Sequence, residues 1–136
     1  MFVKRSSLRV RYAETDQMGV VYYGNYPQYF EVGRVEALRT LGMSYRQMEE
    51  NGIMLPVLTL EIKYIRPALY DDLLTIETRI TELPSTRITF HHEIFNEDNN
   101  LLTKGLVQLV FLNSSNRRPC KAPQNFLDKI QPYFTR

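Results

Sequence analysis

The sequence is poor in the residues that build disulfides and metal sites. Its 136 residues include no tryptophan, one cysteine, Cys120, and two histidines, His91 and His92. One cysteine excludes an internal disulfide and a zinc site made of several cysteines, which favours a reduced, cytoplasmic setting. The two histidines are consecutive in a predicted strand, where neighbouring side chains point to opposite faces, so we expect no metal site there. Cys120 stands in a polar stretch without a histidine near it and is interpreted as an incidental thiol.

Long apolar runs and an excess of one charge are absent as well. No stretch approaches the roughly 20 apolar residues that cross a bilayer, and residues 1–12, MFVKRSSLRVRY, lack the apolar run of a signal peptide. The chain has 17 basic and 15 acidic residues, a balance too even for a nucleic-acid surface. Apolar residues make up 43% and charged residues 24%, as in a globular protein. We expect one soluble domain over residues 1–136, with neither nucleic acid nor membrane insertion.

Residues 25–41 have the periodicity of a long helix. Apolar side chains recur there at i, i+3 and i+4, and further valines widen this face, so the helix should be covered on more than one side. Asn25 is placed to cap its first turn and Gly42 to follow its last. Glu31 and Arg34 stand three positions apart on this helix and are expected to form an ion pair.

Short runs of alternating or continuous apolar residues predict five strands. Alternation turns Leu74, Ile76 and Ile80 inward. Short connections between the last four strands imply antiparallel neighbours, and an alternating sheet beside such a helix indicates that the sheet curls around it. The last strand is apolar on both faces, which calls for further cover, most simply from a second copy of the chain. The predicted strands are residues 7–12, 55–65, 72–81, 87–95 and 101–113, with short helices at 44–52 and 122–134.

Two stretches carry a family resemblance. TDQMGVVYYGNYPQYFEVGRVE, residues 15–36, matches a T-D-x-x-G-V-V-Y-x-x-N-Y motif followed by a helix with F-E-x-x-R, and YIRPALYDDLLTIET, residues 64–78, matches a connection between two strands. In this order and at this separation they resemble the hot-dog fold thioesterases, and among these the 4-hydroxybenzoyl-CoA thioesterase family, which includes the acyl-CoA thioester hydrolases encoded beside the Tol–Pal genes. The resemblance covers nearly the whole chain. It implies an α+β fold in which an antiparallel sheet of about five strands wraps around one long central helix.

The resemblance also implies roles for single residues. The family's catalytic aspartate falls on Asp16, and the position at the start of the helix, whose backbone N–H forms an oxyanion hole in the benzoyl-CoA branch, falls on Tyr23. Tyr12 matches a tyrosine of the Tol–Pal branch. That branch has a histidine where this chain has Tyr23, so a mechanism with that histidine as base is not available here. The family implies hydrolysis of acyl-CoA to a carboxylic acid and free CoA by a homodimer or homotetramer, with the pocket between two subunits and no cofactor.

The chemistry of these residue types agrees with a thioesterase. A thiolate leaves readily, so one carboxylate can suffice, with Asp16 acting either as general base on water or as nucleophile. The first N–H groups of a helix have no intrahelical partners and can stabilise an oxyanion. Basic residues at the mouth of the pocket would meet the phosphates of CoA. The expected substrate contacts are Tyr12, Gly19, Val20, Tyr22, Asn25, Thr59, Arg66 and Arg87, with Arg117, Arg118 and Lys121 as further candidates for the phosphates.

Other interpretations stay open at this stage. An aspartate in a loop before a helix is most often a turn or cap residue. Tyr12 and Tyr22 also suit packing, and Glu61, on the polar face of its strand, is a rival carboxylate. A non-catalytic acyl-CoA or acyl-carrier binding module would use the same fold. A hydratase ranks last, because it needs a histidine beside an acid and neither histidine lies near the motif in sequence.

Overall fold

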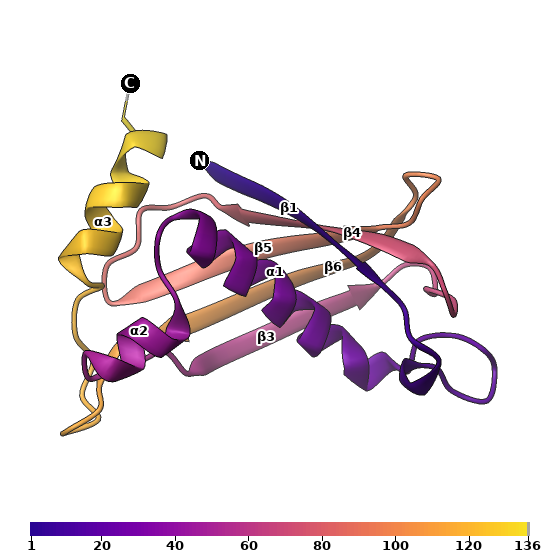
Figure 1. The fold of residues 1–136 in the computed structure, drawn as a ribbon, viewed down its shortest axis with the longest axis horizontal. Coiled ribbons are helices and arrows are strands. Elements are labelled where there is room, and N and C mark those ends of the chain that lie inside the picture. The colour runs from indigo at the N-terminus through magenta and orange to yellow at the C-terminus, as the bar shows by residue number, and fades with distance from the viewer. Residues whose placement is uncertain (136) are drawn as a thin grey trace.

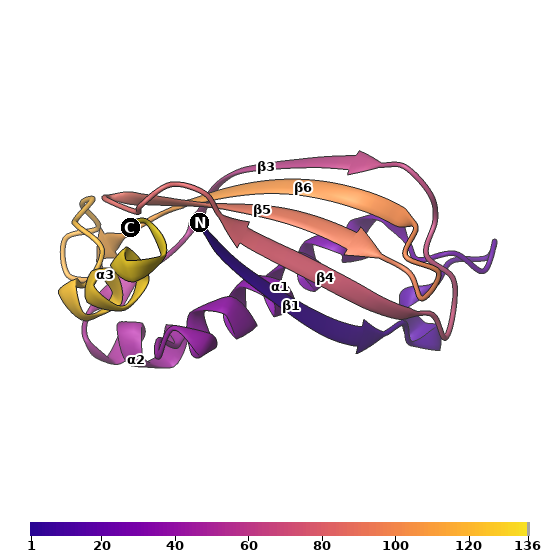
Figure 2. The same ribbon diagram turned by 90° about the horizontal axis from the view of Figure 1, so that it is seen from above.

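A long helix, α1 (Tyr26–Thr40), runs across one face of a five-stranded antiparallel sheet that curls around it (Figure 1, Figure 2). The computed structural model describes residues 1–135. The strands lie in the order β1-β4-β5-β6-β3, so β1 and β3 are the two edges. This is the hot-dog arrangement expected from the sequence. The strands are β1 (Phe2–Arg9), β3 (Val57–Tyr64), β4 (Leu73–Ile80), β5 (Arg87–Phe95) and β6 (Leu101–Val110).

The smaller elements that follow α1 gather at one end of the sheet (Figure 1). A short helix, α2 (Tyr45–Glu50), is followed by a two-residue strand, β2 (Ile53–Met54), which pairs with β7 (Leu112–Asn113). The chain finishes with α3 (Gln124–Ile130) and a 3₁₀ turn, η3 (Gln131–Tyr133). No helix within residues 1–135 has the length and apolar character needed to cross a membrane.

The core lies between α1 and the inner face of the sheet. Phe30 of α1 is fully buried, as are Ile76 of β4 and Phe90 of β5. Each such side chain stabilises the fold by about 2 kcal/mol when it leaves water. Gly105 of β6 lies beneath Phe30, where an added Cβ would stand 2.4 Å from the ring. The missing side chain therefore allows α1 to approach the sheet closely.

The predicted strand pattern is largely confirmed, with one correction. Leu74, Ile76 and Ile80 are fully buried as expected. The first strand was predicted over residues 7–12 but spans Phe2–Arg9, because the backbone leaves the sheet at Val10 and enters a 3₁₀ turn. On the outer face of β6 Lys104 is exposed in the single chain, and cover of that face by a second copy stays a prediction.

The helix ends confirm the predicted stop signals but not the predicted cap. Gly42 follows α1 with a φ of 77°. Asn25 was expected to cap α1, yet its side chain bonds no N–H of the helix and instead donates from Nδ2 to the carbonyl of Glu14 at 2.8 Å. The expected pair between Glu31 and Arg34 does not form in the described chain. Arg34 is buried, and its Nε donates to the hydroxyl of Tyr45 at 3.1 Å.

Candidate functional site

The chain between β1 and α1, residues 10–25, folds into a compact loop at the end of the sheet remote from α2 and α3 (Figure 1). Thr15 and Val21 pair across this loop as an isolated antiparallel bridge, and Val20 pairs in the same way with Leu69. Backbone hydrogen bonds of this kind hold a loop without regular strands. The loop is therefore fixed against the connection between β3 and β4.

A cavity of about 400 Å³ opens between this loop, the start of α1 and the end of β3. Its lining is mostly apolar or aromatic, with Asp16 as its carboxylate and Arg66 as its cation. A concave apolar site with a few polar groups is typical of small-molecule binding. The lining residues are Asp16, Met18, Val20, Val21, Tyr23, Tyr26, Tyr64, Ile65, Arg66 and Pro67.

Asp16 is held by a tight turn at the cavity. Its Oδ1 accepts the N–H of Met18 at 2.8 Å, and its own N–H donates to the carbonyl of Val20 at 2.8 Å. Gly19 closes the turn with a φ of 78°, a conformation that other residues adopt only at a cost. The interpretation of Asp16 as a turn residue is thus correct for one oxygen. Its Oδ2 receives no hydrogen bond from residues 1–135 and is a free acceptor on a residue that lines the cavity.

Tyr23 begins the helical run that leads into α1. The 3₁₀ turn η2 (Tyr23–Asn25) precedes α1 directly, so the first helical residue is earlier than the Asn25 predicted from caps. Asn25 N–H donates to the carbonyl of Tyr22 at 2.9 Å. In a trans peptide the N–H points opposite to the carbonyl, so the Tyr23 N–H points away from the helix. No acceptor within residues 1–135 bonds it, and it stands at the positive end of the helix dipole.

Two tyrosines form the wall beside Tyr23. The hydroxyl of Tyr64, from the end of β3, donates to the carbonyl of Tyr23 at 2.9 Å. The rings of Tyr64 and Tyr26 meet edge to face with centroids 5.3 Å apart, and the Tyr26 hydroxyl accepts the N–H of Ala68 at 3.3 Å. Burial raises the pKa of both hydroxyls, which stay protonated at neutral pH. This wall joins the start of α1 to the edge strand.

Four of the predicted site residues line the cavity: Asp16, Tyr23, Val20 and Arg66. Another four lie in the surrounding loop without lining it. Tyr12 is exposed and packs edge to face on Tyr70, with ring centroids 5.5 Å apart. The others are Gly19, which closes the turn, Tyr22, whose ring packs beside that of Tyr23, and Asn25, which donates to the carbonyl of Glu14.

The remaining predicted contacts lie away from the cavity of the single chain. Thr59 stands opposite Gln108 on the outer face of the sheet, the face that does not contact α1. Arg87 begins β5 at the far end of the sheet and approaches Gln108 at 3.5 Å (Figure 1). The connection between β7 and α3 also lies at that far end, and it carries Arg117, Arg118 and Lys121.

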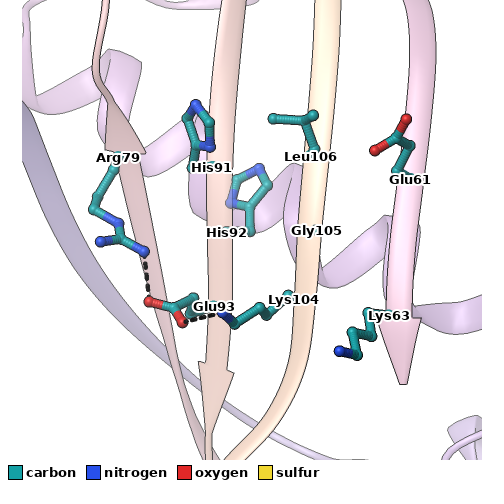
Figure 3. Close-up of a pocket in the computed structure, with 9 residues that line it drawn as sticks. All are labelled: Glu61, Lys63, Arg79, His91, His92, Glu93, Lys104, Gly105 and Leu106. Carbon is teal, nitrogen blue, oxygen red and sulfur yellow. Dashed lines mark hydrogen bonds and ion pairs between the residues drawn. The ribbon is translucent and has the colours of Figure 1, made fainter. Parts of the chain in front are cut away.

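The rival carboxylate Glu61 lines a second hollow of about 280 Å³, on the outer face of the sheet (Figure 3). There Glu93 of β5 bonds Arg79 of β4 at 2.5 Å and meets Lys104 of β6 at 3.9 Å. His91 lies on this outer face, whereas His92 is buried on the inner face and stacks on Phe30. The prediction that the two histidines face opposite ways is confirmed. Within residues 1–135 no cluster of His, Cys, Asp or Glu has the grouping of a metal site.

Sequence reasoning missed Tyr26, Tyr64 and Glu14. The first two were assigned to helix and strand packing, and only the tertiary structure brings them to the cavity. Glu14 is not among the candidate site residues that the sequence indicates. It is buried and bonded on both oxygens. A buried ion in a loop has no periodic signal in sequence, although a capping-box spacing from Arg11 to Glu14 is present.

Comparisons with known proteins agree with this architecture. A family model described as the thioesterase-like superfamily matches residues 10–130. The chain is 32% identical over 128 residues to a putative acyl-CoA thioesterase, YneP, from Bacillus subtilis, covering 94% of this chain and 93% of that protein. It is 32% identical over 127 residues to the acyl-CoA thioester hydrolase YbgC from Escherichia coli, covering 93% and 95%. The DHNA-CoA thioesterase from Staphylococcus aureus superposes with a TM-score of 0.90 at 34% identity, over 98% of this chain and 90% of that one.

Proposed function

The chain belongs to the thioesterase-like superfamily, and on that premise we propose that it hydrolyses acyl-CoA thioesters to a carboxylic acid and free CoA. The names of the B. subtilis and E. coli relatives support this activity. The observation that carries the proposal is a single cavity lined both by the Asp16 carboxylate and by Tyr23 at the start of the helical run. We assign the activity to one domain, residues 1–136, and place it in the cytoplasm.

Asp16 is the proposed general base. Its free oxygen takes a proton from a water molecule, and the water oxygen bonds to the carbonyl carbon of the thioester. The tetrahedral intermediate then breaks its carbon–sulfur bond, the thiolate of CoA leaves and takes up a proton, and Asp16 releases its own proton to solvent. A thiol pKa near 8.5 makes this leaving group good without a dedicated acid. The Met18 N–H on the other oxygen of Asp16 fixes the direction of the carboxylate.

The Tyr23 N–H is the proposed donor to the carbonyl oxygen. It has no other acceptor within residues 1–135 and stands at the positive end of the helix dipole. One preorganised donor of this kind stabilises an oxyanion transition state by about 3 kcal/mol. The donor belongs to the start of the helical run and the base to the preceding turn, so the two can act on one carbonyl from different sides.

The acyl group would lie against the tyrosine wall. Tyr26 and Tyr64 present ring faces and edges with fixed hydroxyls, which suits an aryl or a short acyl group better than a long chain. Arg66 is the proposed contact to a phosphate of CoA, because it is the cation in the lining.

We infer that the working unit is at least a homodimer formed through β3. Val57, Leu58, Leu60 and Tyr64 on this edge strand are each between 41% and 48% exposed, and an exposed apolar edge is a ready surface for strand pairing. The end of β3 borders the cavity, so a second copy would add a wall to it. Thr59, on the same strand, would then lie at the contact between copies rather than in the single chain's cavity.

The proposal is tested by release of free thiol from a panel of aromatic and aliphatic acyl-CoAs, for the wild type and for Asp16→Asn. The substitution keeps the size of the side chain and an oxygen to accept the Met18 N–H, so the turn should survive. We expect turnover of at least one thioester by the wild type and a loss of about 100-fold or more in the variant. Acyl-CoA binding without thiol release would replace the proposal with the non-catalytic binding module.

A further inference from the structure

Glu14 is the buried carboxylate of the loop before α1, and both of its oxygens are bonded. Oε1 accepts the backbone N–H of Arg11 at 2.9 Å and the hydroxyl of Tyr29 at 2.9 Å. Oε2 accepts Nε and Nη2 of Arg11 at 3.1 Å and 3.0 Å. Tyr29 lies on the buried face of α1. The side chain of Glu14 therefore ties the first turn of the loop to the helix, and no oxygen is left for chemistry.

The backbone of Glu14 makes a second set of ties. Its carbonyl accepts the N–H of Tyr22 at 2.9 Å and Nδ2 of Asn25 at 2.8 Å. These two donors stand on either side of Tyr23 in the chain. In the other direction Glu14 is only two residues from Asp16. Glu14 is thus bonded to residues on both sides of Tyr23, the proposed oxyanion donor, and stands next to the turn that holds Asp16, the proposed base.

The charge of Glu14 suits this role. Burial by itself raises the pKa of this carboxyl, but the hydrogen bonds from the Arg11 N–H, from Tyr29 and from the Arg11 guanidinium outweigh burial and hold the pKa below its ordinary value. At neutral pH the group is ionised and only accepts hydrogen bonds, so every donor around it has a defined direction. A carboxamide in its place would turn an NH₂ group toward one of these donors.

We propose that Glu14 is a positioning residue that fixes the Asp16 carboxylate and the Tyr23 N–H relative to each other. This inference rests on the proposed thioester hydrolysis. A catalytic arrangement has to hold to about 0.5 Å, and a misplacement of about 1 Å can cost 100-fold in rate. Because Glu14 does not line the cavity, its loss should lower kcat and leave substrate binding nearly unchanged.

Glu77 of β4 provides a matched control. It is 8% exposed against 9% for Glu14, and it is also bound by arginine: Arg5 at 2.8 Å and Arg79 at 3.4 Å. Its side chain lies on the outer face of the sheet, away from α1 and the cavity. If Glu14 has only a structural role, its replacement and the replacement of Glu77 should therefore have the same effects on kcat and on stability.

The test measures kcat, KM and the thermal unfolding midpoint for wild type, Glu14→Gln, Tyr29→Phe and Glu77→Gln, with an acyl-CoA that the wild type hydrolyses. We expect Glu14→Gln to lower kcat roughly 10- to 100-fold while KM changes less than about threefold. Tyr29→Phe, which removes one donor, should lower kcat about 3- to 10-fold. Glu77→Gln should lower the midpoint as much as Glu14→Gln but keep kcat within about twofold of wild type.

The outcomes separate the two proposals. An active wild type with unchanged kcat in a folded Glu14→Gln overturns the role of Glu14 alone, as does an equal loss of kcat in Glu77→Gln. If Glu14→Gln does not fold, Tyr29→Phe decides: a lower kcat at an unchanged midpoint supports the role, and an unchanged kcat overturns it. A wild type that releases thiol from no acyl-CoA overturns the proposed function and the role of Glu14 with it.

Discussion

The hollow on the outer face of the sheet and the cavity beside α1 both carry charged side chains, and they differ in what those groups already bind. In the outer hollow Glu93 is bound by Arg79 and Lys104, whereas Glu61 bonds no group within residues 1–135 (Figure 3). In the cavity one oxygen of Asp16 and the N–H of Tyr23 have no partner within residues 1–135. Polar groups that satisfy each other stabilise a fold, whereas free ones beside an apolar wall are available to a ligand. Of the two, the cavity is the one that combines a free carboxylate oxygen with an unbonded N–H at the start of a helical run, and this combination is our ground for placing the reaction there.

Replacing the carboxylate of the cavity and that of the outer hollow should give the largest difference in kcat/KM. Asp16→Asn should lower kcat/KM about 100-fold or more, or roughly 2.7 kcal/mol, because the proposed base is lost. Glu61→Gln, in the outer hollow, should leave kcat/KM within about twofold, because that carboxylate lies on the face opposite α1. Thiol release from the same acyl-CoA measures both. A large loss in Glu61→Gln with an active Asp16→Asn would reverse the comparison.

His91 and His92 lie on opposite faces of the sheet, so variants of the two residues compare how acid affects the stability of each face. Burial, then the nearby charges of Arg34 and His91, lower the pKa of His92 to about 3. The unfolded chain binds a proton near pH 6.5 and the folded chain only near pH 3, so stability is full above pH 6.5 and falls as the pH drops toward 3. At pH 4.5, two units below 6.5, the expected loss is about 2.7 kcal/mol.

Urea unfolding between pH 4.5 and 7.5 measures this loss. Replacing His92 with Asn should flatten the dependence of the unfolding free energy on pH, apart from the contribution of other groups. His91→Asn, on the outer face, should keep the wild-type dependence. Equal flattening in both variants would show that the two faces do not differ in this way.

The smallest expected effect concerns the tyrosine wall. Tyr64→Phe keeps the ring contact with Tyr26 but removes the hydrogen bond to the carbonyl of Tyr23. A hydrogen bond of this kind contributes about 1 kcal/mol, so kcat should fall about 5- to 10-fold through a looser start of α1. On the outer face, Thr81→Ala removes the contact of Thr81 with His91 at 3.2 Å and should leave kcat unchanged. Steady-state kinetics measures kcat of both variants. If Tyr64→Phe has the same kcat as Thr81→Ala, the tyrosine wall serves only packing.

Much of the fold could be predicted because its signals are local. The period of α1, the alternation of β4 and the glycine after α1 each belong to a single segment. Asp16 and Tyr23 were named through the family resemblance rather than a local pattern, and both line the cavity. The first strand was misplaced because apolar alternation continues through Val10 after the hydrogen-bonded ladder has ended at Arg9.

The rest of the site depends on contacts that no local pattern records. Tyr64 and Arg66 join the cavity only because β3 ends beside the loop. Thr59 was predicted to contact the substrate, but it lies on the outer face of the sheet, next to a register shift between Val57 and Thr59. Alternation alone does not say which face of a strand meets the helix. Glu14 and Asp16 are both carboxylates two positions apart, and only their bonding partners separate a buried anchor from a free acceptor.

The pairing of β1 with β4 sets the order in which this molecule can be completed. Phe2 lies opposite Ile80 and Arg9 opposite Leu73, so the first strand made is a partner of one made much later. Contacts between such distant segments form slowly, because a long loop must close first. The loop with Asp16 follows β1 directly and is anchored to the connection before β4. During synthesis Asp16 and Tyr23 therefore leave the ribosome well before Tyr64 and Arg66, and the cavity assembles only after the segment that follows β3 has been made.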